Sequence, residues 1–285
     1  MSANIFKIEG QRVDSQDEFA RLEEENSWRD LLYYPESFQS ANRHPIVFSE
    51  KVFERISFKD TDFRNIRFLR CQFKQCLFAG ASFSDCEFID CRFFETNTSK
   101  LRVTRCLLDP KDFKNNFDLI DDTNIAIGLY QSLYKNASDE HQPDHSIESL
   151  YQMERAKHAH LDSQKKRNVI TRREYLKGKI RHWMYDFVTG YGLRPLRVVR
   201  LLFIVVGLFS TLNFLFDSLI FGENGSLSFV DSIYFTVVAI TTLGFGDIVP
   251  ITTAGRVFVT FQALLGFVAM SLFLSAIVNI ALRSR

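Results

Sequence analysis

Residues 48–93 read FSEKVFERISFKDTDFRNIRFLRCQFKQCLFAGASFSDCEFIDCRF. Phenylalanine recurs in this stretch at every fifth position, ten times without a break. The ten are Phe48, Phe53, Phe58, Phe63, Phe68, Phe73, Phe78, Phe83, Phe88 and Phe93. A second column, two residues before a phenylalanine, holds mostly small or apolar side chains: Ile56, Thr61, Ile66, Cys71, Cys76, Ala81, Cys86 and Cys91. Neither an α-helix nor a β-strand keeps a five-residue period on one face, so we expect the chain to turn a corner with each repeat.

These repeats resemble the pentapeptide-repeat family. The resemblance implies a right-handed, four-sided β-helix with one pentapeptide on each side and twenty residues in each coil, here over residues 48–113. Weaker repeats at Val103, Leu108 and Phe113 continue it. Because a solenoid needs capped ends, we expect the polar residues 1–47, with a short helical pattern near residues 19–32, to form the N-terminal cap.

All five cysteines lie inside the repeats, between Cys71 and Cys106. A twenty-residue coil stacks Cys71 on Cys91 and Cys86 on Cys106, where small thiols fill a narrow core. No histidine joins these columns and the CxxC spacing of zinc and redox sites is absent. We therefore predict packing cysteines, with no metal site and, in the cytoplasm, no disulfides.

The charge balance argues against nucleic acid as a partner. The net charge is +1, and residues 48–113 hold twelve Lys and Arg against ten Asp and Glu. Some pentapeptide-repeat proteins imitate DNA with a strongly acidic surface, which this chain lacks. A scaffold, assembly or regulatory role is the expectation for the repeats, with a cytoplasmic regulator left unidentified.

Residues 114–170 are predicted to form a helical hairpin that connects the repeats to the rest of the chain. Apolar residues at helical spacing mark both helices: Ile125, Leu129, Leu133 and Tyr134 in the first, and Leu150, Met153 and Ala156 in the second. His158 and His160 are two residues apart on the second helix and face different directions, so a metal site there is not expected.

Residues 171–192 interleave basic residues with aromatic and aliphatic ones. That composition predicts an amphipathic helix at a membrane surface, and a helix packed on the connector is the alternative. Gly190-Tyr191-Gly192 superficially copies a potassium filter. It follows a charged segment and precedes the first span, so we interpret it as a turn leading into Pro195.

Residues 193–285 are the predicted pore domain. Apolar segments at about 198–222 and 256–282 are each long enough to span about 30 Å of hydrocarbon as a helix. Basic residues precede the first span and follow the second, which places both ends in the cytoplasm. The first thirty residues hold no apolar run of a secretory signal. We expect a two-span protein of a cell membrane, the inner membrane of a bacterium.

Between the spans, an apolar stretch of helix length at about 229–241 is followed by Thr242-Leu243-Gly244-Phe245-Gly246-Asp247. This arrangement resembles the potassium channels, whose filter reads Thr-Val-Gly-Tyr-Gly, commonly with Asp next. Glycine permits the backbone conformations that turn carbonyls toward an axis. The resemblance implies a filter at residues 242–247 in a homotetramer, with the ion bound by Thr242, Leu243, Gly244, Phe245 and Gly246.

The resemblance assigns further residues around the filter. Tyr234, Thr241 and Asp247 would support it, with the Tyr234 hydroxyl donating to Asp247. Gly266, twenty residues beyond Gly246, matches the gating hinge of two-span bacterial channels, and helix packing is the alternative. The predicted lining of the cavity and gate is Phe267, Met270, Leu274 and Val278. The chain has no arginine-rich membrane helix, so no voltage sensor is expected.

The sequence thus predicts a multidomain fold, a β-helix followed by a helical connector and an all-α pore. We expect a potassium-selective channel subunit, not an enzyme, with K⁺ as permeant ion, no cofactor, and its own copies and the lipid bilayer as partners. A non-selective cation channel and a membrane-anchored scaffold are the alternatives. Because the sequence ends three residues after the second span, gating input is expected from the N-terminal half. The stimulus, the selectivity ratio, the ligand of the repeats and the arrangement of the cytoplasmic domains do not follow from the sequence.

Overall fold

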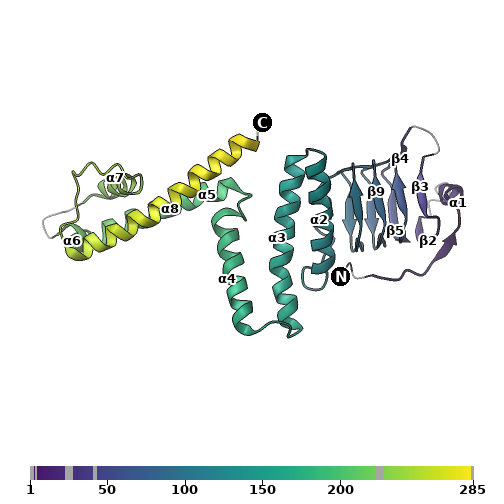
Figure 1. Cartoon of the computed structure of the whole chain (residues 1–285), viewed down its shortest axis with the longest axis horizontal. Coiled ribbons are helices and arrows are strands. Elements are labelled where there is room, and N and C mark those ends of the chain that lie inside the picture. Colours follow the sequence, from purple (N-terminus) through teal and green to yellow (C-terminus); the bar gives the residue numbers. More distant parts are fainter. Residues whose placement is uncertain (1–2, 4, 23–27, 41–43, 223–226, 284–285) are drawn as a thin grey trace. The chain divides into compact units, whose positions relative to one another are not determined.

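The computed structural model describes residue 3 and residues 5–22, 28–40, 44–222 and 227–283, with side chains up to Val278. The chain divides into two compact units, Met1–His182 and Trp183–Arg285. Figure 1 shows the β-strands gathered in the first unit and the longest helix in the second. Each unit is described by itself.

The first unit begins with a β-solenoid of about four turns, built from three parallel sheets. One sheet contains β1 (Gln11–Val13), β2 (Arg29–Tyr33), β5 (Val52–Ser57), β8 (Gln72–Lys74) and β11 (Arg92–Phe94). The second contains β4 (Ile46–Ser49), β7 (Ile66–Leu69), β10 (Glu87–Ile89) and β13 (Leu107–Leu108). The third contains β3 (Ser37–Gln39), β6 (Asp62–Arg64), β9 (Ser82–Ser84) and β12 (Arg102–Thr104). The fourth side is joined by single bridges from Ser57 to Leu77 and from Leu77 to Asn97. The predicted β-helix is confirmed.

Stacked phenylalanines form the core of the solenoid. Phe53 pairs with Phe73 and Phe73 with Phe93, each one coil of twenty residues further along the chain. Their ring centroids lie 4.9 and 4.7 Å apart, and Phe113 stacks on Phe93 at 4.1 Å. Each such pair contributes about 0.5–1.5 kcal/mol beyond the burial of its area. The continuation of the repeat to Phe113 is therefore present in the structure.

The corners of the solenoid occur at one fixed position of the repeat, two residues after each phenylalanine or after Thr98 and Val103, which take its place. There the backbone has positive φ at Glu50, Arg55, Asp60, Asn65, Arg70, Gln75, Gly80, Asp85, Asp90, Glu95, Lys100 and Arg105. A left-handed residue other than glycine costs about 1–2 kcal/mol. Burying one phenylalanine stabilises the fold by about 1.5–3 kcal/mol, so the core outweighs the strain of its corners.

The N-terminal segment differs from the prediction. Of the helix expected near residues 19–32, the described residues show α1 (Gln16–Arg21), whereas residues 29–33 form strand β2, which pairs with β5. Leu31 and Tyr33 point into the core together with Phe19. The repeat was hidden here because Leu31 aligns with Ile56 at a spacing of 25 residues, five more than in the regular coils.

Helices close the other end of the solenoid. After the short 3₁₀ helix η1 (Pro110–Phe113), α2 (Thr123–Asp139) and α3 (Pro143–Lys166) form the predicted hairpin. The Asn136 amide accepts from the backbone N–H of Cys106 at 3.0 Å and donates to its carbonyl at 2.8 Å. Asn116 does the same for Thr96 at 2.8 and 2.9 Å. The side-chain amides of Asn116 and Asn136 thus hydrogen-bond to backbone groups that would be unpaired at an open strand edge.

Helix α4 (Arg172–Thr189) follows α3. In the first unit, Asp162 of α3 accepts from the Tyr175 hydroxyl at 2.9 Å and from the Lys179 ammonium at 2.6 Å. His160 bonds to the Thr123 hydroxyl at 2.8 Å, while His158 stacks on His182. The two histidines therefore contact different neighbours.

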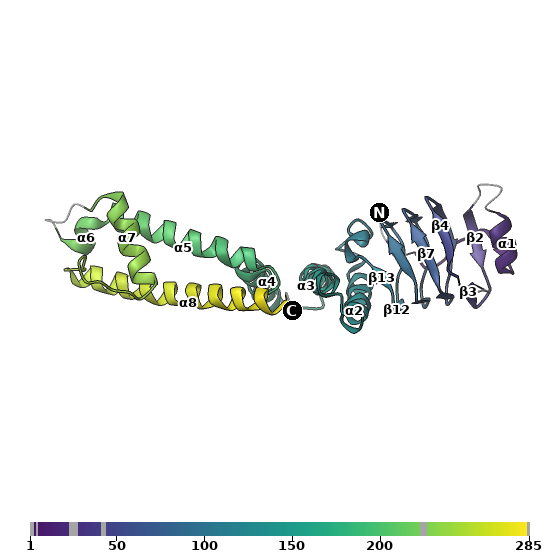
Figure 2. The same cartoon turned by 90° about the horizontal axis from the view of Figure 1, so that it is seen from above.

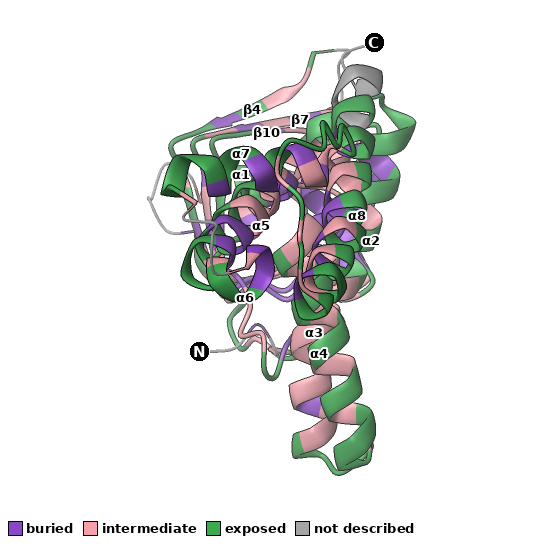
Figure 3. Cartoon of the chain, turned by 90° about the vertical axis from the view of Figure 1, so that its left-hand side faces the viewer, coloured by how far each residue is buried: buried purple, intermediate pink, exposed green. Residues whose placement is uncertain are grey.

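The second unit consists of α5 (Pro195–Leu215), α6 (Asp217–Phe221), α7 (Phe229–Ile240) and α8 (Thr253–Arg283), together with the end of α4. Residues 198–222, expected to form one span, are divided between α5 and α6. Figure 2 shows α5 and α8 side by side with α7 against them. Only 22% of the most apolar stretch of α5 and 17% of that of α8 is buried; Figure 3 colours the residues by their burial. Helices this apolar and this exposed are suited to a membrane, not to a soluble core.

Candidate pore site

Helix α7 is short and apolar, and its N-terminus is capped by hydrogen bonds. Ser228 accepts from the Asp231 backbone N–H at 3.1 Å, and Asp231 accepts from the Ser228 backbone N–H at 3.0 Å, which is a capping box. At the other end, the N–H of Leu243 reaches the carbonyl of Val238 at 3.1 Å and closes a Schellman motif. The segment 242–247 therefore begins directly at the carbonyl end of the helix.

The backbone of this segment has an unusual conformation. φ is +60° at Thr242, +55° at Gly244 and +79° at Gly246, whereas Leu243 and Phe245 have negative φ. A Cβ on either glycine would meet no atom within 4 Å, so the requirement for glycine is conformational and not one of space. Thr242 adopts the left-handed conformation without that freedom, a strain typical of functional sites.

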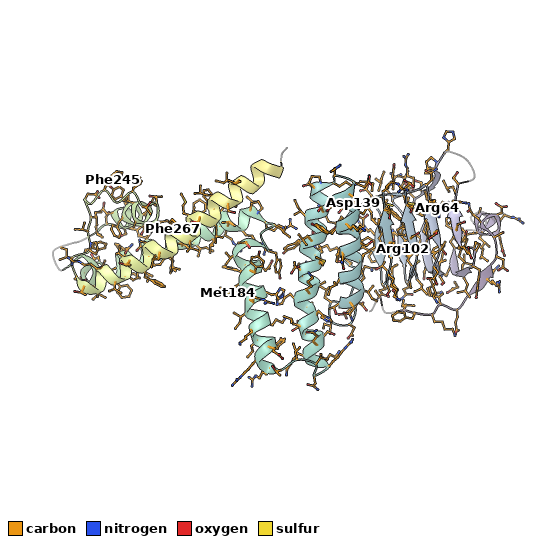
Figure 4. All side chains as sticks on the ribbon, viewed as in Figure 1. Arg64, Arg102, Asp139, Met184, Phe245 and Phe267 are labelled. Carbon is orange, nitrogen blue, oxygen red and sulfur yellow. The ribbon has the colours of Figure 1, made fainter. Side chains whose placement is uncertain are left out.

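The large side chains of the segment are exposed in the single chain. Leu243 is 63% and Phe245 66% exposed in the single chain. The ring of Tyr234 lies parallel to that of Phe245, with centroids 6.5 Å apart. The Tyr234 hydroxyl donates to Asp247 Oδ2 at 2.7 Å, the contact expected from the sequence. Figure 4 labels Phe245 beside α7. Thr241 uses its hydroxyl within α7, donating to the Val237 carbonyl at 2.7 Å.

Gly266 lies where α8 meets the end of α7. A Cβ at Gly266 would come within 2.5 Å of Ile240 Cγ1, and Ile240 is 2% exposed. Helix α8 continues unbroken through this position. This close contact supports the packing interpretation of Gly266. Its role as a gating hinge stays a prediction.

Two faces of α8 can be distinguished. Gln262, Gly266, Ala269 and Ala276 are buried against the rest of the unit. The residues predicted to line the cavity lie on another face: Phe267, Leu274 and Val278 are exposed and Met270 is half-buried. Figure 4 labels Phe267 on this helix. The predicted lining is therefore available to contact neighbouring chains or a cavity.

A polar cluster behind α7 was missed by the sequence analysis. Asn213 of α5 donates to the Thr236 hydroxyl of α7 at 2.9 Å and to Gln262 Oε1 of α8 at 3.1 Å. All three side chains have 0% exposure. The available signal was an amide side chain inside each of two apolar spans, since polar residues in membrane helices commonly mark helix contacts.

Comparison with protein families agrees with this geometry. Residues 201–283 match a family described as ion channel, and residues 56–93 match pentapeptide repeats in eight copies. No curated protein matches the chain. The chain therefore joins a region that matches pentapeptide repeats to a region that matches an ion-channel family and holds two helices long and apolar enough to cross a membrane, which supports an ion-channel subunit.

Proposed function

We propose that this subunit conducts K⁺ selectively and passively across a cell membrane. The observation that carries the proposal is the alternating sign of φ along Thr242–Gly246 at the end of a pore helix. An extended strand points alternate groups to opposite sides, whereas reversal at every second residue turns successive carbonyls toward one side. Rows of carbonyls of this kind can replace the hydration shell of K⁺.

The charges around the segment favour a cation. Residues 201–282 contain Asp217, Glu223, Asp231 and Asp247 but a single basic residue, Arg256. The carbonyl end of α7 carries the negative end of a helix dipole, and the segment starts there. Both effects raise the local concentration of cations and oppose anions.

We propose a homotetramer, in which each chain supplies one quarter of every ion site. One copy leaves residues 242–247 exposed throughout, with no described group of the same chain facing the carbonyls of a binding site. Four copies around one axis would complete the shell. The proposed domains keep the boundaries 1–47, 48–113, 114–170, 171–192 and 193–285, with both termini in the cytoplasm and the repeats as an assembly or regulatory module.

The proposal is tested by potassium flux into liposomes that contain the purified protein. Gly244→Ala and Gly246→Ala force a side chain onto left-handed backbone, so flux is expected to fall to the level of empty liposomes. Gly207→Ala is the matched control, because a Cβ at this helical glycine meets no atom within 4 Å. Its flux should equal that of the unmodified channel.

Two outcomes would contradict the proposal. Equal flux from the unmodified protein and both filter variants would leave a membrane-anchored scaffold as the function. Flux that depends on Gly244 and Gly246, with a reversal potential indifferent to the exchange of Na⁺ for K⁺, would indicate a non-selective cation channel.

A further inference from the structure

The buried cluster of Asn213, Thr236 and Gln262 joins the three longest helices of the pore domain, α5, α7 and α8, at one point. The Asn213 amide nitrogen uses both of its hydrogens, one toward α7 and one toward α8. Asn213 and Thr236 are 23 residues apart, and Asn213 and Gln262 are 49 apart. Among the described side chains, Asn213 therefore hydrogen-bonds α5 to both α7 and α8.

This arrangement is not the one that stability alone would select. Asn213 Oδ1, Gln262 Nε2 and the nearby Ser210 Oγ are buried and have no hydrogen-bond partner among the described residues. Leaving such groups unpaired is costly, and apolar side chains of the same shape would avoid the cost. The two hydrogen bonds that Asn213 does make are strengthened by the low dielectric around them, and they fix one placement of α5, α7 and α8 relative to one another.

The cluster lies one helical turn from the contact between Gly266 and Ile240. Thr236 and Ile240 are four residues apart on α7, as are Gln262 and Gly266 on α8. Residues at this spacing share a helix face, so α7 is held to α8 at two successive turns. One attachment is a close steric contact, and the other is a hydrogen-bonded one that runs through Asn213.

The opposite face of α7 carries the support of the filter. Tyr234 and Thr236 are two residues apart, which places them on different sides of the helix. Tyr234 donates to Asp247 while Thr236 accepts from Asn213. Rotation of α7 would move Tyr234 and the start of the segment at Thr242 together.

We propose that Asn213, Thr236 and Gln262 are positioning residues that fix the rotation of α7 and thereby the geometry of the ion filter. The role rests on the proposed function, since it concerns the same filter. It predicts that loss of the cluster's hydrogen bonds weakens the discrimination between K⁺ and Na⁺ and shortens the conducting state, while the subunits still assemble.

The decisive comparison is between two variants of one residue. Thr236→Val keeps the shape and removes the hydroxyl, whereas Thr236→Ser keeps the hydroxyl and removes a methyl group. Relative Na⁺ permeability from reversal potentials is expected to rise about fivefold in Thr236→Val, the size of one lost hydrogen bond, and to stay near the original value in Thr236→Ser. Gln262→Met should behave like Thr236→Val.

Thr211→Val is the matched control, because Thr211 is an exposed residue of α5 whose hydroxyl donates only to the Gly207 carbonyl of its own helix, at 2.8 Å. Hydrogen–deuterium exchange of residues 232–241 supplies a second readout that does not depend on selectivity. Exchange should increase in Thr236→Val and Gln262→Met, and it should not change in Thr236→Ser or Thr211→Val.

Unchanged permeability and exchange in Thr236→Val and Gln262→Met would overturn the proposal. So would equal defects in Thr236→Val and Thr236→Ser, which would indicate packing without a positioning role for the hydroxyl. If the unmodified channel does not select K⁺, the proposed function fails, and the exchange of residues 232–241 still decides the role of the cluster.

Discussion

Asp112 lies in η1, at the end of the solenoid, where it lines a cavity of about 320 Å³ with Asp90, Arg92 and Lys114 among its other walls. Its Oδ2 is buried and has no hydrogen-bond partner in the described part of the chain. Burial, together with the negative charges of Asp109 and Asp90, raises the pKa of Asp112 to about 7, although Arg92 opposes the shift. The carboxyl is therefore held in a site that favours its neutral form.

Asp112→Asn is expected to stabilise the solenoid more at pH 8 than at pH 5. The folded protein binds a proton on Asp112 that the unfolded chain has already lost between its usual pKa of 3.8 and about 7. Stability contributed by this group is thus present at low pH and is lost as the pH rises through that window. Since the group is partly exposed, solvent screening limits the gain at pH 8 to about 1 kcal/mol.

The five cysteines provide the measurement, because all are buried in the solenoid and none lies elsewhere. Urea midpoints of their reaction with a dipyridyl disulfide, which modifies thiols at both pH values, should differ between variant and original protein by more at pH 8 than at pH 5. All five thiols are at most 1% exposed, so they should react slowly in the folded protein. A variant that is equally stabilised at pH 5 would show that charge on Asp112 is not the cause.

Among the helices, α4 presents an apolar stripe that the described residues leave uncovered. Ile180, Trp183, Met184 and Phe187 follow one another at helical spacing and are 57%, 61%, 52% and 38% exposed. Basic residues occur along the same helix and at the start of α5. This composition agrees with the predicted position at a membrane surface.

Bilayers that contain brominated phospholipid are expected to quench the fluorescence of Trp183, because the indole would lie among the lipid chains near the headgroups. The chain has two tryptophans, and Trp28 is buried in the solenoid with 6% exposure. Trp183→Phe is therefore the control, and its remaining emission should be unaffected by the brominated lipid. Equal quenching in both proteins, or none in either, would argue for α4 packed on protein.

For the whole molecule, conduction is expected to be a property of four chains. Native mass spectrometry of the detergent-solubilised protein should give four times the 33.1 kDa of one chain. The physical reason is the exposure of residues 242–247 and of both apolar helices in the single chain. A closed ring of identical interfaces would cover these surfaces.

Co-expression supplies the functional counterpart. If one Gly244→Ala subunit inactivates a tetramer, mixing equal amounts of the two chains before assembly should leave about one sixteenth of the flux, since subunits combine at random in a symmetric oligomer. Flux that falls only by half would mean that each chain conducts alone. A loss by about three quarters would indicate a dimer.

Much of the fold follows from the sequence because its signals are local or strictly periodic. The phenylalanine period predicted a chain that turns with each repeat, and the family resemblance of these repeats implied the solenoid, whose register is set by stacking at twenty-residue spacing. The contact between Tyr234 and Asp247, which spans 13 residues, was expected from the resemblance of this segment to potassium channels. The ion-binding role of Thr242–Gly246 stays a prediction, although the glycine pattern anticipated the positive φ of its glycines.

Contacts between distant segments were decided by tertiary structure. The sequence does not reveal that Asn136 completes the edge at Cys106, that β2 extends the solenoid across a 25-residue coil, or that Asn213 meets Thr236 and Gln262. A polar residue on a helix carries no record of which distant helix it will face. Periodic patterns determine which side of an element is buried, whereas only the packing of the helices determines which buried polar groups come within hydrogen-bonding distance.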